Sequence, residues 1–185
     1  MTDGSPIAPG RKCGTCTLCC KVMKIDELEK PRGIWCRHCS VGVGCRTYDD
    51  RPGECRKFLC GYLTEASLSE DWLPTKSKIV LAADLDGKRI AAHVDTSRPD
   101  AWKAEPYYSQ LKEWARLAAP VNGQVLACVG RTTVVILPDK DVDLGVVADN
   151  ELIVTLERVT PLGITVDALK IRNDDPRAAA LVNRK

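Results

Sequence analysis

The stretch Cys13-Gly-Thr-Cys16-Thr-Leu-Cys19-Cys20 places four thiols close together near the start of the chain. Nine of the ten cysteines lie between Cys13 and Cys60. Cysteines that pack in a core are scattered among apolar residues, as Cys128 is, whereas these thiols alternate with Gly, Thr, Arg and Lys. The pattern therefore indicates a chemical role. The nine candidates are Cys13, Cys16, Cys19, Cys20, Cys36, Cys39, Cys45, Cys55 and Cys60.

Three kinds of chemistry use clustered cysteines: disulfide bonding, thiol redox catalysis and metal ligation. No apolar signal-peptide core precedes Cys13, so we expect a cytoplasmic protein, and disulfides do not persist in the cytoplasm. Nine thiols would also leave one unpaired in any all-disulfide scheme. A redox C-x-x-C motif should follow a strand and open a helix, and no strand-like run precedes Cys13. Metal ligation is the interpretation that these observations favour.

The spacing of the thiols suits two metal centres. A two-residue spacer lets two thiolates reach one ion at the Zn–S distance of about 2.3 Å, and Cys13/Cys16, Cys16/Cys19 and Cys36/Cys39 have that spacer. Four thiolates satisfy one tetrahedral zinc or one 4Fe-4S cluster, so nine are too many for a single centre. Neighbouring side chains diverge on a helix or a strand. We therefore expect Cys19 and Cys20 to serve different ions or a shared binuclear centre.

The sequence favours zinc as the metal and leaves iron or a 4Fe-4S cluster as the alternative. The run Cys13, Cys16, Cys19 reproduces the C-x2-C-x2-C part of an iron–sulfur signature. That signature then needs a fourth cysteine after three residues and a following proline, whereas Cys20 follows at once. Copper or another soft metal is also compatible with thiolate ligands.

The cysteine-rich segment is basic. Arg11 to Cys60 carries eleven Lys and Arg against six Asp and Glu, a net charge of +5, and the rest of the chain is −3, which gives the total of +2. Cations lower thiol pKa values and offset the negative charge of a metal–thiolate centre. An ordinary solvated face would show the same excess, so both interpretations stay open. With a pI near 8.0 the whole chain is less basic than nucleic-acid-binding domains usually are.

Several of these residues together resemble a known family. They are Cys13-x-x-Cys16-x-x-Cys19-Cys20, the cysteines at 36 and 45, and Tyr48-Asp-Asp-Arg51-Pro52-Gly-Glu-Cys55-Arg56-Lys-Phe58. This pattern resembles the bacterial cysteine-cluster family called YkgJ, whose domain is described as a zinc- or iron-chelating CxxCxxCC module. Some members were once assigned as flagellin N-methylases. The resemblance covers residues 12–60 and has no counterpart for residues 70–172.

The resemblance implies metal chelation by seven of the nine thiols, namely Cys13, Cys16, Cys19, Cys20, Cys36, Cys45 and Cys55. Cys39 and Cys60 lie outside the shared pattern, so their candidacy depends on spacing alone. Near Cys55, Pro52 predicts a turn, and Arg56 is expected to donate hydrogen bonds to a thiolate or a carboxylate. Tyr48 and Phe58 are expected to wall off the site, and His38 to be a loop residue more than a ligand.

The expected fold class is α+β, with a small Cys-rich module organised by metal, followed by an α+β domain of antiparallel hairpins with one main helix. In the module, Leu18, Val22, Ile25 and Leu28 recur at helical spacing and predict an amphipathic helix that ends at Pro31. Residues 32–60 are rich in loop formers and poor in core residues, so metal should supply their folding free energy. The expected segments are a flexible leader (1–11), the cysteine module (12–63), a connector (64–75), the α+β domain (76–172) and a tail (173–185).

The second domain shows strand and helix patterns. Two runs flank Asp86-Gly87 and predict a hairpin, Pro106 to Ala118 predicts a helix, and a second hairpin is expected over residues 124–137. Three further short strands are expected between Asp143 and Leu169. No catalytic motif occurs here, and His93 has the pattern of a half-buried sheet residue.

The leading hypothesis is a cytoplasmic metal-binding protein that holds one or two Cys-ligated centres, with the second domain as a binding module for an unknown protein or small molecule. An iron–sulfur-dependent enzyme, whose second domain binds a substrate, is the alternative. A nucleic-acid-binding zinc module is less favoured. No membrane association is expected, since no apolar stretch is long enough.

Overall fold

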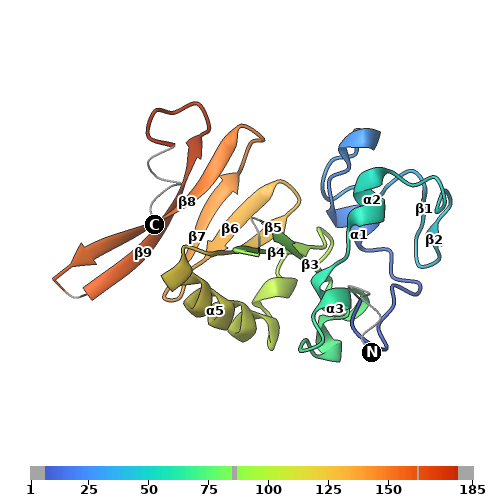
Figure 1. The fold of residues 1–185 in the computed structure, drawn as a ribbon, viewed down its shortest axis with the longest axis horizontal. Coiled ribbons are helices and arrows are strands. Elements are labelled where there is room, and N and C mark those ends of the chain that lie inside the picture. Colours follow the sequence, from blue (N-terminus) through green and yellow to red (C-terminus); the bar gives the residue numbers. More distant parts are fainter. Residues whose placement is uncertain (1–6, 85–86, 162, 179–185) are drawn as a thin grey trace.

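A sheet of five strands forms the centre of the molecule, in the order β3-β4-β5-β6-β7 (Figure 1). The structure is a computed structural model that describes residues 7–84, 87–161 and 163–178. Helices and strands are mixed and most strand pairs are antiparallel, which confirms the expected α+β class. The strands of this sheet are β3 (Ile79–Asp84), β4 (Arg89–Val94), β5 (Gln124–Val129), β6 (Thr132–Ile136) and β7 (Asp141–Val146).

Both predicted hairpins are confirmed. Strands β3 and β4 pair antiparallel with Ile79 opposite Val94, and β5 and β6 pair antiparallel with Val129 opposite Thr132. Gly130 turns the second hairpin with a φ of +58°, a conformation that costs glycine little. Asp86, one half of the predicted first turn, lies outside the described residues.

The expected antiparallel hairpins are present, but the sequence did not predict the parallel pair that joins them in the middle of the sheet. Strands β4 and β5 are parallel, with Arg89 opposite Gln124 and His93 opposite Cys128. Parallel neighbours need a crossover connection, and residues 95–123 supply it through helix α5 (Tyr107–Ala118). The turn signals of two hairpins fix the pairing within each hairpin but not the way in which the hairpins join.

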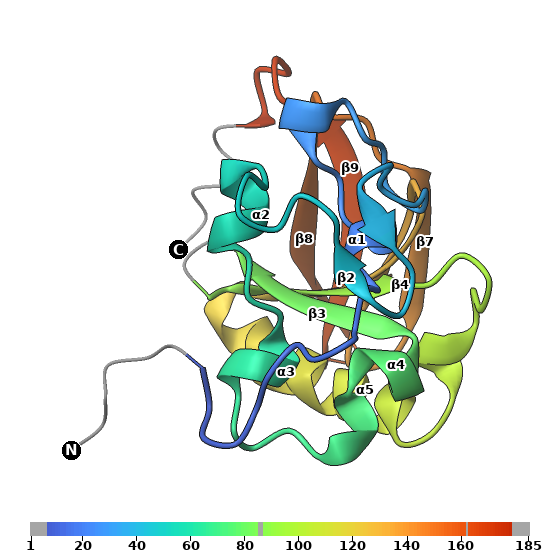
Figure 2. The ribbon, with the colours of Figure 1, turned by 90° about the vertical axis from the view of Figure 1, so that its right-hand side faces the viewer.

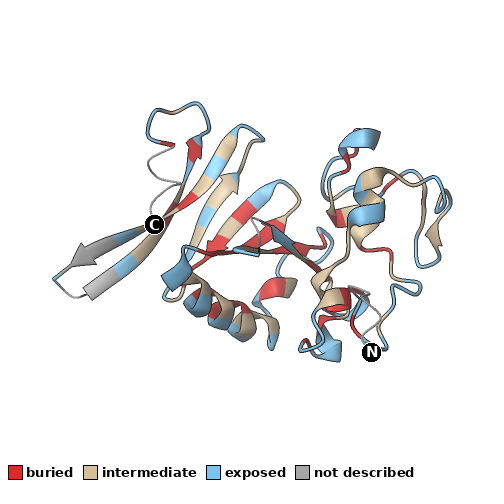
Figure 3. Cartoon of the chain, viewed as in Figure 1, coloured by how far each residue is buried: buried red, intermediate tan, exposed pale blue. Residues whose placement is uncertain are grey.

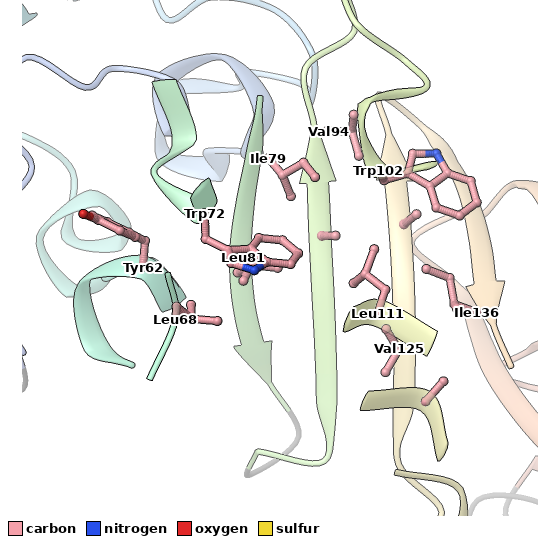
Figure 4. Packing of buried hydrophobic residues seen from close by; sticks show 13 residues of the cluster. Tyr62, Leu68, Trp72, Ile79, Leu81, Val94, Trp102, Leu111, Val125 and Ile136 are labelled. Atoms are coloured by element: carbon pink, nitrogen blue, oxygen red, sulfur yellow. The ribbon is translucent and has the colours of Figure 1, made fainter. Parts of the chain in front are cut away.

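Helix α5 covers one face of the sheet because its apolar residues lie on one side. Leu111 is 0% exposed and Ala118 packs against the same cluster, whereas Leu117 is 68% exposed. Trp72 stacks on Trp114 with ring centroids 5.2 Å apart and is itself 1% exposed. Figure 4 shows this core between helix and sheet, which includes Tyr62, Leu68, Trp72, Ile79, Leu81, Val94, Trp102, Leu111, Val125 and Ile136.

A long hairpin lies against the other face. Strands β8 (Glu151–Thr160) and β9 (Gly163–Arg172) pair antiparallel as a separate two-stranded sheet that extends beyond the main one (Figure 1). Ala168, Ile153 and Val166 from this hairpin pack on Leu126 and Val135 of the sheet. The central strand β5 is therefore covered on both faces, which explains why Gln124 to Cys128 are all buried (Figure 3).

We call residues 12–64, the segment that carries the nine clustered cysteines, the cysteine-rich half. It consists of short elements joined by turns, and it packs beside β3 (Figure 2). Its contact with the sheet includes a small apolar cluster of Leu18, Val22 and Val80. The elements are α1 (Cys19–Val22), η1 (Asp26–Leu28), β1 (Cys39–Ser40), β2 (Gly44–Cys45), α2 (Gly53–Lys57) and α3 (Gly61–Thr64). The remaining helical turns of the chain are η2 (Glu70–Trp72), α4 (Pro74–Ser77), η3 (Ala101–Lys103) and η4 (Ala119–Val121).

The predicted amphipathic helix from Leu18 to Pro31 is wrong in length. Helix α1 ends at Val22, and Met23 is extended with a ψ of 146°. The chain then turns back on itself, because the Lys30 ammonium donates hydrogen bonds to the carbonyl oxygens of Lys21, Met23 and Pro31. The apolar spacing that suggested one helix is satisfied by a short helix and a loop that bury the same stripe: Leu18, Val22 and Ile25 are 7%, 3% and 4% exposed.

Three segments that were expected to be peripheral contribute to the packing. In the expected connector, Leu68 and Trp72 belong to the main core. In the expected leader, the Arg11 guanidinium donates to the carbonyl oxygens of Tyr62, Glu65, Ala66 and Leu68. In the expected tail, Ala178 is 4% exposed. Residues 1–6 of the leader and 179–185 of the tail lie outside the described residues.

Among the described residues, none of the helices is long and apolar enough to cross a membrane.

Candidate metal centre in the cysteine-rich half

Main-chain hydrogen bonds bring distant cysteines together. The Cys16 amide donates to the Cys13 carbonyl at 3.0 Å and closes the first C-x-x-C turn, and the Cys39 amide donates to the Cys36 carbonyl at 3.0 Å and closes the second. The second turn is tied to α1, because the Cys36 amide donates to the Cys20 carbonyl at 2.9 Å. A pair of short strands then places Cys45 directly opposite Cys39.

The last two cysteines come from helical turns. Cys55 lies in α2, and Cys60 is the residue before α3, where its carbonyl accepts hydrogen bonds from the amides of Leu63 and Thr64. Cys60 also packs, with Cys16 and Cys19, against the apolar cluster of Leu18, Val22 and Val80. Phe58 packs on the same cluster, as expected for a residue that walls off the thiols.

Five thiols interact around Cys20, and we call them the Cys20 group: Cys20, Cys36, Cys39, Cys45 and Cys55. Burial raises the pKa of the Cys55 thiol, and the neighbouring Cys20, Cys36 and Cys45 raise it further. The pKa of Cys39 is raised to about 11, mainly by burial and further by the neighbouring thiols of Cys20 and Cys36. Three segments that are distant in sequence thus supply thiols to one place.

The other four thiols form a second set, the Cys60 group: Cys13, Cys16, Cys19 and Cys60. Burial raises the pKa of the Cys60 thiol, the Leu63 amide lowers it, and Cys13 and Cys16 raise it again. Cys19 belongs with this set through the apolar cluster that it shares with Cys16 and Cys60. Its thiol also makes a hydrogen bond with Cys20, which is the largest cause of the raised pKa of Cys20. Burial raises the pKa values of Cys13 and Cys16, and Cys20 raises both further, so Cys20 acts on both groups and the two are in contact.

Cations lie close to both groups. Burial lowers the pKa of Lys30. Four nearby thiols oppose this and raise that pKa, namely Cys36, Cys20, Cys19 and Cys55. The Arg51 guanidinium is close enough to Cys55 and Cys13 to be influenced by both. Lys78, at the start of β3, lowers the pKa of Cys16 against the dominant effect of burial. The basic excess of this half thus includes cations that face thiols and is not wholly a solvated surface.

The thiols of the two groups are donors that suit a soft metal ion. Their side chains do not, however, form a coordination sphere. All ten cysteines are described, and all are free thiols. Within the described part of the chain, no three His, Cys, Asp or Glu side chains lie in an arrangement that could hold a metal ion. The main chain therefore gathers the thiols into two neighbourhoods, and ion binding would require the side chains to move closer together.

Arg56 and Tyr48 have different surroundings from those expected, whereas His38 lies in a turn, as expected. Arg56 donates to the carbonyl oxygens of Arg51 and Asp49, at 2.8 Å each, and not to a thiolate or carboxylate. Tyr48 is 61% exposed, so it does not wall off the thiols, and its ring lies under the Arg51 guanidinium. His38 is partly exposed in the loop between Cys36 and Cys39.

His93 is more buried than its sequence pattern suggested, whereas Cys128 packs among apolar residues as its position in the sequence predicted. His93 is 5% exposed, so it is buried and not half-buried, and its Nδ1 has no hydrogen-bond partner among the described residues. Cys128 lies opposite His93 in the sheet, and its Sγ accepts a hydrogen bond from the Thr133 hydroxyl at 3.9 Å. Cys128 is therefore remote from the thiols of the other half, as its isolated position predicted.

Lys30 is the residue near the thiols that sequence reasoning missed. It was counted only as one of eleven positive charges, yet it is 7% exposed and holds three carbonyl oxygens. Its place in the sequence, between Glu29 and Pro31, does not set it apart from the other lysines of this segment.

Compared with models of protein families, with curated proteins and with solved structures, the chain matches none. The likeness to the YkgJ family remains a resemblance of residues 12–60.

Proposed function

We propose that this protein binds one or two soft metal ions through the thiolates of its N-terminal half, with zinc favoured and iron or a 4Fe-4S cluster as the alternative. The observation that carries the proposal is the convergence of the Cys20 group. Its five cysteines come from α1, from the loop that leads into β1, from β1 and β2, and from α2, and none of them is in a disulfide. Such a gathering of unpaired soft donors is typical of a metal-binding protein.

The poor core of this half supports the proposal. Between residues 32 and 60, Cys36 is the one described residue in the buried class. Hydrophobic burial is therefore too small to fix loops of this length, and small domains of this kind commonly use metal ions or disulfides in its place. In peptide systems a structural zinc supplies about 10–16 kcal/mol of folding free energy. We propose that metal organises this half in the same way.

The division into two thiol groups supports two centres. Four thiolates complete a tetrahedral zinc site, and the Cys60 group has four. The Cys20 group has five, one more than a single tetrahedral ion needs. The contact between Cys19 and Cys20 provides a place where the two centres would share a boundary.

The test is elemental analysis of the full chain purified without oxygen, together with its visible spectrum. We expect about one or two equivalents of metal, with a colourless protein for zinc and visible absorption for iron–sulfur. Cys20→Ser and Cys60→Ser should each lower the metal content, whereas the matched control Cys128→Ser should leave it unchanged because that thiol is buried in the sheet. Protein that carries no metal under these conditions, or a loss that is equal in all three variants, would contradict the proposal.

A further inference from the structure

An open cleft lies on the surface of the cysteine-rich half. It has a volume of about 480 Å³ and lies between η1 and the turn that leads into α2. This volume falls within the range of about 300–1,000 Å³ that is usual for small-molecule sites. Leu28 and Pro52 supply apolar lining, and His38, Arg51 and Arg56 supply polar groups.

Most of the lining comes from segments that carry Cys39, Cys45 and Cys55; Glu27 and Leu28 come from η1, and none of the cysteines itself lines the cleft. His38 lies between Cys36 and Cys39 in the sequence, and Arg51 and Arg56 flank Cys55. Thr47 also lines the cleft, and its hydroxyl oxygen is 3.6 Å from the Cys45 Sγ. A molecule bound in the cleft would therefore lie next to the thiols, and no separate domain would be needed to bring it there.

Arg51 is fixed in place but retains free hydrogen-bonding capacity. Its guanidinium lies over the Tyr48 ring at 3.9 Å from the centroid, which fixes the plane of the group. Its Nε is buried and has no hydrogen-bond partner within the described part of the chain. Arg51 lines the cleft, so the remaining N–H groups of its guanidinium are the ones that would meet a bound acceptor.

Arg56 is held by the chain in a similar way. Its Nε donates to the Arg51 carbonyl and one of its terminal nitrogens donates to the Asp49 carbonyl, both at 2.8 Å. A guanidinium has five N–H donors, so these two bonds position the group without using it up. Arginines of this kind bind the paired oxygens of carboxylates and phosphates through two parallel hydrogen bonds.

Two acidic residues in the lining limit the charge of the ligand. Glu27 is engaged by the chain, since its Oε1 accepts a hydrogen bond from the Glu54 amide at 3.3 Å. Asp50 also lines the cleft and opposes the binding of further negative charge. A small molecule with a single anionic group fits this balance better than a polyanion does.

We infer that the cleft binds a small molecule through one oxyanion group, a carboxylate or a phosphate, held by Arg51 and Arg56 beside the thiols of the Cys20 group. The inference concerns the ligand of the cleft and does not depend on which metal the thiols bind.

The test uses the chain's two histidines, which give separate proton NMR signals. The ring signals of His38, in the cleft, should shift on titration of the full, reduced chain with lactate or with inorganic phosphate. The signals of His93, buried in the sheet, serve as the internal reference. A response to lactate alone identifies a carboxylate site, and a response to phosphate alone identifies a phosphate site; either supports the inference.

Arg51→Gln should weaken the binding at least about tenfold, because a hydrogen-bonded charged partner is lost. The matched control is Arg46→Gln, since Arg46 is an arginine of the same cysteine-rich half that donates to the Arg37 carbonyl but does not line the cleft. If Arg51→Gln disturbs the fold, Arg51→Lys keeps the charge and removes the planar fork, and it should still weaken the binding. Metal content is measured on the same samples, so that a loss of metal is distinguished from a loss of the arginine.

No shift of the His38 signals with either probe would overturn the inference. So would equal affinities in Arg51→Gln, Arg51→Lys and Arg46→Gln at equal metal content.

Discussion

The ion pair between Lys21 and Asp95 joins the cysteine-rich half to the sheet, and its removal should be costly. The Lys21 Nζ lies 2.5 Å from the Asp95 carboxylate, and the two side chains are only 12% and 10% exposed. Lys21 belongs to α1, directly after Cys20, and Asp95 follows β4. The Ser97 amide and hydroxyl also donate to Asp95 Oδ1, at 2.9 Å each, so this oxygen accepts three hydrogen bonds.

Asp95→Ala should destabilise the protein by about 3–5 kcal/mol, because it leaves a buried ammonium without its partner. For a chain of this size, 1 kcal/mol corresponds to about 2–4 °C in Tm, so the expected fall in Tm is about 6–20 °C. The double variant Lys21→Met/Asp95→Leu should recover much of the loss, since no buried charge is then unpaired.

Urea unfolding followed by tryptophan fluorescence would measure these changes, at constant metal content. Asp149→Ala is the control, since it removes the ion pair between Lys24 and Asp149, in which the Asp149 side chain is 87% exposed. We expect no resolvable change for it, because exposed pairs contribute little.

The pH dependence gives a second check on the same pair. Burial alone would raise the pKa of Asp95, but the Lys21 ammonium and the Ser97 donors outweigh it and hold this pKa below its usual range. The stabilisation is therefore present above about pH 4 and is lost as the pH falls through the lowered pKa of the folded state. The difference between wild type and Asp95→Ala should shrink in acid. A variant as stable as the wild type at pH 7, or a difference that grows in acid, would refute the reasoning.

Two further perturbations have definite expected outcomes. In the metal-free, reduced protein, Cys39 has a pKa raised to about 11, first by burial, so the folded state holds its protons more firmly than the unfolded chain does. The contribution of Cys39 to the free energy of unfolding should be fully present below about pH 8.5 and should fall as the pH rises towards 11. Urea midpoints measured at about pH 8 and about pH 10.5 would show the fall. An unchanged midpoint, or the same fall in Cys39→Ser, would count against this. In helix α5, Leu111→Ala should cost about 2–5 kcal/mol since the side chain is 0% exposed, whereas Leu117→Ala, at 68% exposure, should stay within about 0.5 kcal/mol. Thermal unfolding of the two variants compares them directly, and equal Tm values would mean that the burial pattern of α5 is wrong.

Local signals in the sequence were sufficient for the second domain. The helix over α5 and the hairpins β3–β4 and β5–β6 follow from periodicity and turn residues, which act over a few neighbouring positions. The parallel pairing of β4 with β5 depends on contacts across 95–123, and no local pattern encodes those contacts.

The cysteine-rich half was harder to predict for a different reason. Apolar spacing from Leu18 to Leu28 fits a helix, but it also fits a short helix and a loop that bury the same side chains. The decision between them depends on Lys30, whose ammonium donates hydrogen bonds to the Lys21 and Met23 carbonyl oxygens, which a continuous helix would have satisfied within itself. The set of nine thiols could be chosen from the sequence, whereas their division into two groups depends on the path of the loops.

The position of β3 at the border of the sheet gives the cysteine-rich half a protective role. An uncovered border strand offers unpaired amides and carbonyls to other chains and so promotes aggregation. Gly61 of the cysteine-rich half lies against this strand. A Cβ at that position would lie 3.0 Å from Leu81 Cβ and 3.7 Å from the Leu81 carbonyl oxygen, so a larger residue would push the cysteine-rich half away from β3. A change that displaces these thiol-bearing loops would therefore expose the border strand to other chains.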